Sequence, residues 1–195
     1  MKLYEVPPDR IRWGRRTVKL NLSFNRVLGV LDVLDDERFD DQSKVDFCLD
    51  LLCRRKWHPK DPELLMAIFK LLEPERKKKS KGKKVFDYVQ DRGLIVAAFW
   101  QAYHIDLSAE HDRLHWFTFL DLLRGLPSDT RLAEVISIRT RPMPKPTKHN
   151  AEERAQLARL KEEYRLEKSE AEQKNELQDG LRRMALTLLQ QVKKG

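Results

Sequence analysis

The stretch LHWFTFLDLLRGLP at residues 114–127 decides the fold class of this chain. Trp116, Leu120 and Leu123 recur at helical spacing within it, which places the three side chains on one face of a helix that begins near His111 and holds Leu114. A glycine and then a proline close the stretch, and both residue types are typical of a helix end. The stretch therefore predicts an amphipathic helix whose apolar face, Trp116 included, is buried in a core.

Helix signals of the same kind occur on both sides of this stretch. Most of the expected helix starts carry a capping residue or an aspartate–proline pair: Ser23, Asp61-Pro62, Asp87, Ser128 or Asp129, and Asn150. One further helix is expected to start near Asp41. Only Thr17–Leu22 alternates polar and apolar residues, which predicts one short strand. Gly93 costs its helix about 1 kcal/mol relative to alanine, so we expect a close packing contact there.

These elements predict a mainly α fold, with a compact helical domain, a short N-terminal strand and a long C-terminal helical extension. Residues 17–141 form the helical domain, which contains an exposed basic loop at residues 76–84. Residues 142–149 are a Pro-rich spacer, because alternating prolines favour extended chain over helix. Residues 150–195 are a charged amphipathic helical tail with an apolar seam at near-heptad spacing: Leu177, Leu181, Met184, Leu188 and Val192.

The formal net charge of +8 suggests a nucleic-acid partner, but its distribution argues against one. The basic loop at residues 76–84 carries seven positive charges, and without them the net charge falls to +1. We therefore expect one basic segment and no folded positive face. The loop is interpreted as solvated chain; the alternative is a weak, salt-sensitive contact with phosphates, without an interleaved aromatic residue to stack on bases.

The cysteines and the apolar runs bear on the compartment. Cys48 and Cys53 lie on different faces of the helix expected there, so we predict no disulfide between them and a reducing environment. The N-terminal residues lack the apolar run of a signal peptide, and no stretch approaches the length of a membrane span.

No motif in the sequence predicts catalysis, a metal or a cofactor. His111 and His115 share the spacing of helical zinc ligands, but Asp112 stands where a zinc protease has glutamate, and no third ligand is suggested. We expect an exposed His111, and a His115 that packs while hydrogen-bonding a neighbour. Glycine-rich phosphate loops and nucleophile turns are missing from the sequence. We therefore predict that the protein is not an enzyme.

Aromatic residues and the tail seam supply the candidate partner-binding residues. Trp100 and Phe119 depart from the main apolar stripes, so one of them is a candidate for an interface. The tail seam exposes further apolar side chains. The predicted partner-binding residues are Trp100, Leu177, Leu181, Met184 and Leu188.

Several motifs between residues 86 and 141 resemble those of the bacteriophage gene-product-fifteen family of Gram-positive siphophages and prophages. The motifs are FDY at 86–88, QAYHIDL at 101–107, LHW at 114–116, GLP at 125–127 and IRTR at 138–141. The resemblance implies a tail assembly chaperone, encoded upstream of the tape measure protein, which binds that protein and tail tube subunits during assembly of a long non-contractile tail. It further implies action in the host cytoplasm and absence from the finished virion.

Two classes of function therefore remain. The first is an assembly chaperone that binds proteins, with the tail seam covering a helical partner, folding back on its own domain or pairing with a second copy of the chain. The second is a basic nucleic-acid-associated phage protein, which the lysine run favours.

Overall fold

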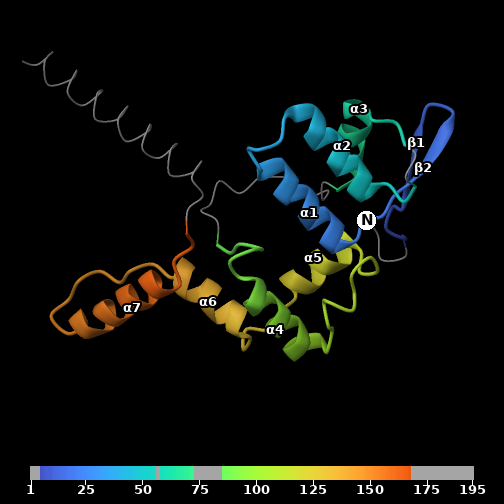
Figure 1. The fold of residues 1–195 in the computed structure, drawn as a ribbon. Coiled ribbons are helices and arrows are strands. Elements are labelled where there is room, and N and C mark those ends of the chain that lie inside the picture. The colour runs from blue at the N-terminus through green and yellow to red at the C-terminus, as the bar shows by residue number, and fades with distance from the viewer. Residues whose placement is uncertain (1–4, 56–57, 73–84, 168–195) are drawn as a thin grey trace, which may run out of the picture. The chain divides into compact units, whose positions relative to one another are not determined.

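The computed structural model describes residues 5–55, 58–72 and 85–167, and the chain divides into two compact units, residues 1–137 and 138–195 (Figure 1). Helices make up 53% of the described residues, and the sheet found among them has two strands. The predicted mainly α fold is therefore confirmed. The basic loop at 76–84 and the tail seam at 177–192 lie outside the described residues.

A β-hairpin stands where one strand was predicted. Strands β1 (Arg10–Trp13) and β2 (Arg16–Lys19) pair antiparallel, and the turn between them contains Gly14 at a φ of 57°. Glycine adopts this left-handed conformation without steric cost, so the chain can fold straight back. The prediction of a strand at residues 17–22 was wrong at both ends. Leu20 forms an isolated bridge to Cys53, and the following residues lead into the first helix.

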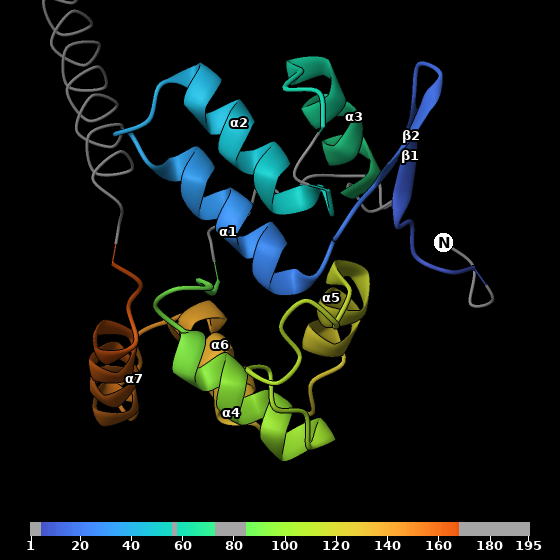
Figure 2. The same cartoon turned by 45° about the vertical axis from the view of Figure 1, so that its right-hand side comes forward.

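Three helices follow: α1 (Phe24–Asp35), α2 (Asp41–Leu52) and α3 (Pro62–Leu72). Helix α2 packs between the other two, as Figure 2 also shows. The Asp40 carboxylate caps α2 by accepting the N–H of Ser43 at 3.0 Å, and the Asp61 carboxylate accepts the N–H of Glu63 at the start of α3. All three helices begin close to the predicted residues.

Helices α4 (Arg92–Tyr103) and α5 (Trp116–Arg124) begin later than the sequence predicted. The Asp87 carboxylate accepts the N–H groups of Val89 and Gln90 at 2.8 Å, which forms a turn, and α4 starts after that turn. Gly93 has nothing within 4 Å of where a side chain would begin, so the close contact expected there is wrong for the described residues.

The start of α5 is joined to the start of α1. Ser23 and His115 form an isolated bridge. The Phe24 N–H donates to Leu114 and the Trp116 N–H donates to Leu22, at 3.0 and 2.8 Å. Ser23 is the N-cap residue of α1, as predicted, but its hydroxyl makes no capping bond. The backbone bridge therefore fixes both helix ends at once.

An aromatic cluster occupies the core beneath these helix ends. Phe119 is 1% exposed and stacks on both Phe24 and Phe99, with ring centroids 5.0 and 5.3 Å apart. Trp116, 8% exposed, stacks on Phe119 at 5.7 Å. Burial of Trp116 is therefore confirmed.

Helix α6 (Arg131–Thr140) crosses from the first unit into the second. Its first turn is capped by the hydroxyl of Thr130, which accepts the N–H of Ala133, and not by Ser128 or Asp129 as predicted. In the second unit, helix α7 (Ala151–Glu163) follows Asn150 as predicted and buries Leu157. Among the residues described beyond it, the chain is no longer helical.

Candidate functional site

The outer face of α4 exposes a large aromatic side chain. Gly93, Ala97 and Trp100 are all exposed, and at ~100° per residue they fall within about 60° of one another around the helix axis. His104, the residue that ends α4, is also exposed and its ring lies 6.2 Å from that of Trp100. Trp100 is 59% exposed, and the turn that precedes α4 exposes Val89. We call these four residues, Gly93, Ala97, Trp100 and His104, the α4 outer face.

This face lacks the charges that usually cover the solvent side of a helix. The segment from Gly93 to Tyr103 contains no charged residue. The opposite side of α4 buries Ile95, Ala98 and Phe99 in the core. Because a helix that is apolar on all sides is typical of one covered on all sides, the α4 outer face is a candidate protein-binding surface.

The packing separates the two aromatic residues that the sequence left as alternatives. Phe119 lies in the centre of the core and cannot reach a partner, whereas Trp100 can. Partner binding by Trp100 stays a prediction. The other predicted binding residues, Leu177, Leu181, Met184 and Leu188, lie outside the described residues, so their relation to Trp100 stays a prediction too.

The two histidines have structural partners. The His115 Nδ1 accepts the N–H of Phe117 at 3.1 Å and so caps α5, while Nε2 lies 3.4 Å from the carbonyl of Pro8. This geometry requires a neutral ring with its proton on Nε2. Burial accordingly lowers the pKa of His115. The prediction that His115 packs and hydrogen-bonds a neighbour is confirmed, and the exposed His111 lies edge-on to Phe24.

Asp112, which the sequence placed in a possible zinc motif, instead fixes the loop before α5. Its carboxylate accepts from the Arg26 guanidinium at 2.5 and 3.2 Å, and its N–H donates to the Asn25 side chain. The hydrogen bonds from Arg26 lower the pKa of Asp112 to about 2. Among the described residues there is no group of three side chains that could hold a metal ion.

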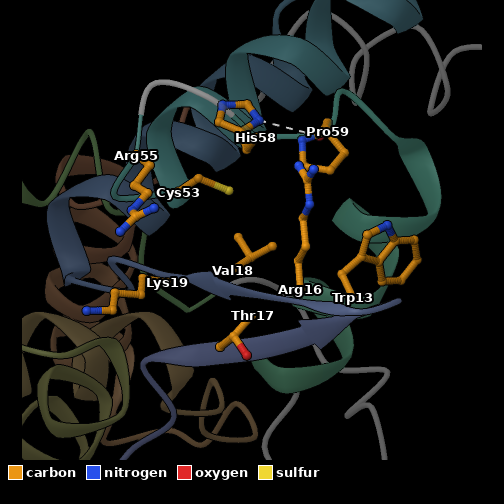
Figure 3. Close-up of a pocket in the computed structure, with 9 residues that line it drawn as sticks. All are labelled: Trp13, Arg16, Thr17, Val18, Lys19, Cys53, Arg55, His58 and Pro59. Atoms are coloured by element: carbon orange, nitrogen blue, oxygen red, sulfur yellow. Dashed lines mark hydrogen bonds between the residues drawn. The ribbon is translucent and has the colours of Figure 1, made fainter.

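A pocket of about 400 Å³ lies beside the hairpin (Figure 3). The hairpin and the chain that follows α2 line it with cationic, polar and apolar side chains: Trp13, Arg16, Thr17, Val18, Lys19, Cys53, Arg55, His58 and Pro59. The hairpin segment carries five basic residues between 10 and 19; the strand register divides them between its two faces, and Arg10 pairs with Asp9. The expectation that the protein has no folded positive face stays a prediction.

Both cysteines are free, in line with the expectation of no disulfide between them, and both are buried. Burial raises the pKa of Cys53 to about 11, so its thiol, which lines the pocket, stays protonated at neutral pH. The pocket therefore offers shape and positive charge and no activated nucleophile.

Comparison with known proteins returned one family. A protein-family model described as Bacteriophage Gp15 protein matches residues 13–166, which is more than half of the chain. No curated protein and no solved structure matches it. In the described part of the chain, no helix combines the length and the apolar character needed to cross a membrane.

Proposed function

Because the chain belongs to the Bacteriophage Gp15 protein family, we propose that it is a tail assembly chaperone. In this proposal it binds the tape measure protein and tail tube subunits while a long non-contractile tail is built. It acts in the host cytoplasm and is absent from the finished virion. Family membership supports the coarser statement, a structural or assembly protein of a phage.

The observation that carries the proposal is Trp100 on the uncharged α4 outer face. Tryptophan is enriched among the residues that dominate binding energy at protein interfaces. A long helical partner presents apolar stripes, and an amphipathic helix binds by laying such a stripe against an apolar surface. The small side chains at positions 93 and 97 let the backbone of a partner helix approach beside the indole ring.

Binding without catalysis agrees with the roles found for the reactive side chains. His115 caps a helix, and Asp112 is paired with Arg26. The pocket thiol of Cys53 is held protonated. We accordingly propose a binding protein that is not an enzyme and uses no cofactor.

Co-expression with the tape measure protein of the same phage or prophage tests the proposal. The wild-type chain should keep that partner soluble and co-purify with it, and Trp100→Glu should weaken the complex about tenfold or more, as for an interface hot spot. Met66→Glu is the matched control, because Met66 is also largely exposed, at 67%, but lies on α3. A tape measure protein that stays insoluble with the wild-type chain would contradict the proposal, and so would equal effects of the two variants.

A second candidate is a nucleic-acid-associated phage protein, which the five basic residues of the hairpin segment favour. That function requires affinity for DNA or RNA that falls steeply with added salt. Replacing hairpin arginines should then abolish binding, while Trp100→Glu should leave it unchanged. The chaperone proposal predicts the reverse for the tape measure complex.

A further inference from the structure

A phenylalanine pair lies on the outer side of α2. The rings of Phe39 and Phe47 are 5.1 Å apart and inclined by 58° to one another, and Phe47 is 46% exposed. Phe39 belongs to the loop 36–40 that joins α1 to α2, and Phe47 lies in the middle of α2. We call these two residues the Phe47 face.

Described parts of the chain bound this face on both sides. On one side the Asp46 carboxylate accepts from the Lys60 ammonium at 2.9 Å. On the other side the Lys44 ammonium donates to a backbone carbonyl of α1 at 2.8 Å. At ~100° per residue, Phe47 lies about 100° from Asp46 and about 60° from Lys44, in the sector between these contacts. The buried Leu49 points about 160° away, so Phe47 is on the side of α2 that faces away from the core.

Carboxylates without a partner flank the Phe47 face in the sequence. Between residues 32 and 50 there are eight acidic and two basic residues, a net charge of −6 in a chain whose total is +8. Among the described residues, four of the eight carboxylates form no ion pair and accept no hydrogen bond, and all four residues are exposed: Asp32, Asp35, Glu37 and Asp41. The face therefore suits a ligand whose cations can pair with carboxylates and also lie on aromatic rings.

Cations of this kind lie at the turn of the β-hairpin. Arg12 and Arg15 are exposed, and neither has a carboxylate partner in the described part of the chain. Arg15 occupies the turn itself, beside Gly14. A guanidinium group can lie flat on an aromatic ring and pair with a carboxylate through two hydrogen bonds, whereas a lysine ammonium is a strongly hydrated point charge. The two arginines therefore match both features of the Phe47 face.

The hairpin and the loop 36–40 lie at opposite ends of the α1–α2 pair, as both Figure 1 and Figure 2 show. The bridge between Leu20 and Cys53 attaches the hairpin where α1 begins and α2 ends. The loop joins the other two helix ends, and a helix of 12 residues is about 18 Å long. The two surfaces of one copy therefore lie apart, and a second copy can bring them together.

We propose that the hairpin turn of one copy docks on the Phe47 face of a second copy, with Arg15 on the phenylalanine rings and Arg12 against the flanking carboxylates. The contact joins two different surfaces, so it is heterologous, and a pair of copies leaves one surface of each kind open for further copies. Exposed ion pairs each contribute little, so we expect weak association, with a dissociation constant on the order of 0.1–1 mM. This contact is separate from the α4 outer face and stands without the chaperone role.

Sedimentation equilibrium of the full-length, nucleic-acid-free protein at low salt, up to about 1 mM, measures this association. Arg12→Glu with Arg15→Glu reverses the charge of the hairpin turn, and Asp32→Lys with Glu37→Lys reverses charge beside the Phe47 face. Each double variant alone should associate at least about tenfold more weakly, because like charges then meet. An equal mixture of the two should associate within about threefold of the wild type, because each reversed surface then meets its complement. Circular dichroism should show native helix content for both double variants.

Two further measurements test the aromatic ring and the role of charge. Phe47→Ala should weaken association about threefold or more, as for a lost cation–π contact at an exposed site. Met66→Ala is the matched control, because it also removes a largely exposed side chain but on α3, and it should leave association unchanged. Salt at about 0.5 M should weaken association at least about tenfold, because exposed charges are then screened within a few ångströms.

The proposal is overturned if the wild-type protein stays monomeric at low salt, if the mixed charge-reversed variants fail to associate, or if Phe47→Ala and Met66→Ala behave alike. Two other results would also overturn it by naming a different contact. Association that Trp100→Glu abolishes would belong to the α4 outer face. Association that survives reversal of the hairpin turn, but not neutralisation of the lysines at 76–84, would give the lysine run the place of the hairpin.

Discussion

Replacing the buried and the exposed tryptophan in turn separates the core of this protein from its proposed interface. Trp116 stacks on Phe119 and lies 6.1 Å from the ring of Tyr88. Trp100 has only the ring of His104, at 6.2 Å, as an aromatic neighbour among the described residues. The two substitutions Trp116→Ala and Trp100→Ala delete the same atoms. The difference between their effects on the free energy of unfolding therefore measures how much the surroundings of each side chain contribute to stability.

The structure gives the size of the expected effect. An aromatic side chain buries about 150–250 Å². At about 25 cal/mol per Å² that area corresponds to roughly 4–6 kcal/mol, an upper estimate because unfolded chains also bury some surface. Measured truncations of buried tryptophan and phenylalanine cost about 3–5 kcal/mol, and we expect Trp116→Ala to fall in that range. Trp100→Ala should cost less than about 1 kcal/mol, because most of its side chain is already in water.

Urea unfolding followed by circular dichroism measures both changes in the free energy of unfolding. A natural domain is stable by only about 5–15 kcal/mol, so Trp116→Ala could leave a partly unfolded protein, and Trp116→Phe serves as the milder variant, at about 1–2 kcal/mol. A change near zero for Trp116→Ala, with loss of partner binding, would move Trp116 from the core to an interface and refute the reasoning.

Other predictions concern pH, the loop before α5 and the tail. Because burial lowers the folded-state pKa of His115, its contribution to stability is complete above the unfolded pKa near 6.5 and is lost as pH falls toward the folded value. His115→Asn can still cap the helix but does not titrate, so it should flatten this pH dependence of stability. Urea unfolding between neutral and mildly acidic pH measures it. Arg26→Ala should lower the free energy of unfolding by no more than about 1 kcal/mol, because the Asp112 carboxylate is half exposed and screened by solvent. Thermal unfolding measures this change, and a larger loss of stability would contradict the prediction. Removing the residues after Pro146 should reduce the solubility of a co-expressed tape measure protein more than neutralising the lysines at 76–84 does. Limited trypsin digestion should cut first within 76–84 or beyond Pro146, and full protection of the lysine run would contradict an exposed loop.

Helices were predictable from the sequence because their signals are local. The starts of α2 and α3 follow from Asp40-Asp41 and Asp61-Pro62, where the capping side chain lies beside the helix it caps. The starts of α4 and α5 were missed because a turn at Asp87 and the imidazole of His115 set them, and neither is a common helix signal. Helix propensity and the spacing of apolar residues therefore do not predict where these two helices begin.

The candidate sites depended on contacts between distant residues. Arg26 and Asp112 are 86 residues apart, so no spacing rule could pair them. The choice between Trp100 and Phe119 needed the packing of α4 and α5, since both residues depart from the apolar stripes. The first strand of the hairpin was within reach of the sequence, because Arg10–Trp13 alternates charged and apolar residues as Thr17–Leu22 alternates polar and apolar ones.

The bridge between Ser23 and His115 has a consequence for synthesis on the ribosome. The apolar face of α1, with Phe24 and Val27, becomes covered only when the segment around Trp116 can reach it. A nascent chain that has emerged only through α3 therefore carries exposed apolar surface and has the loop-closure entropy of the intervening chain still to overcome. Folding of the N-terminal half thus waits for translation of α5, and early arrest of translation would release an aggregation-prone fragment.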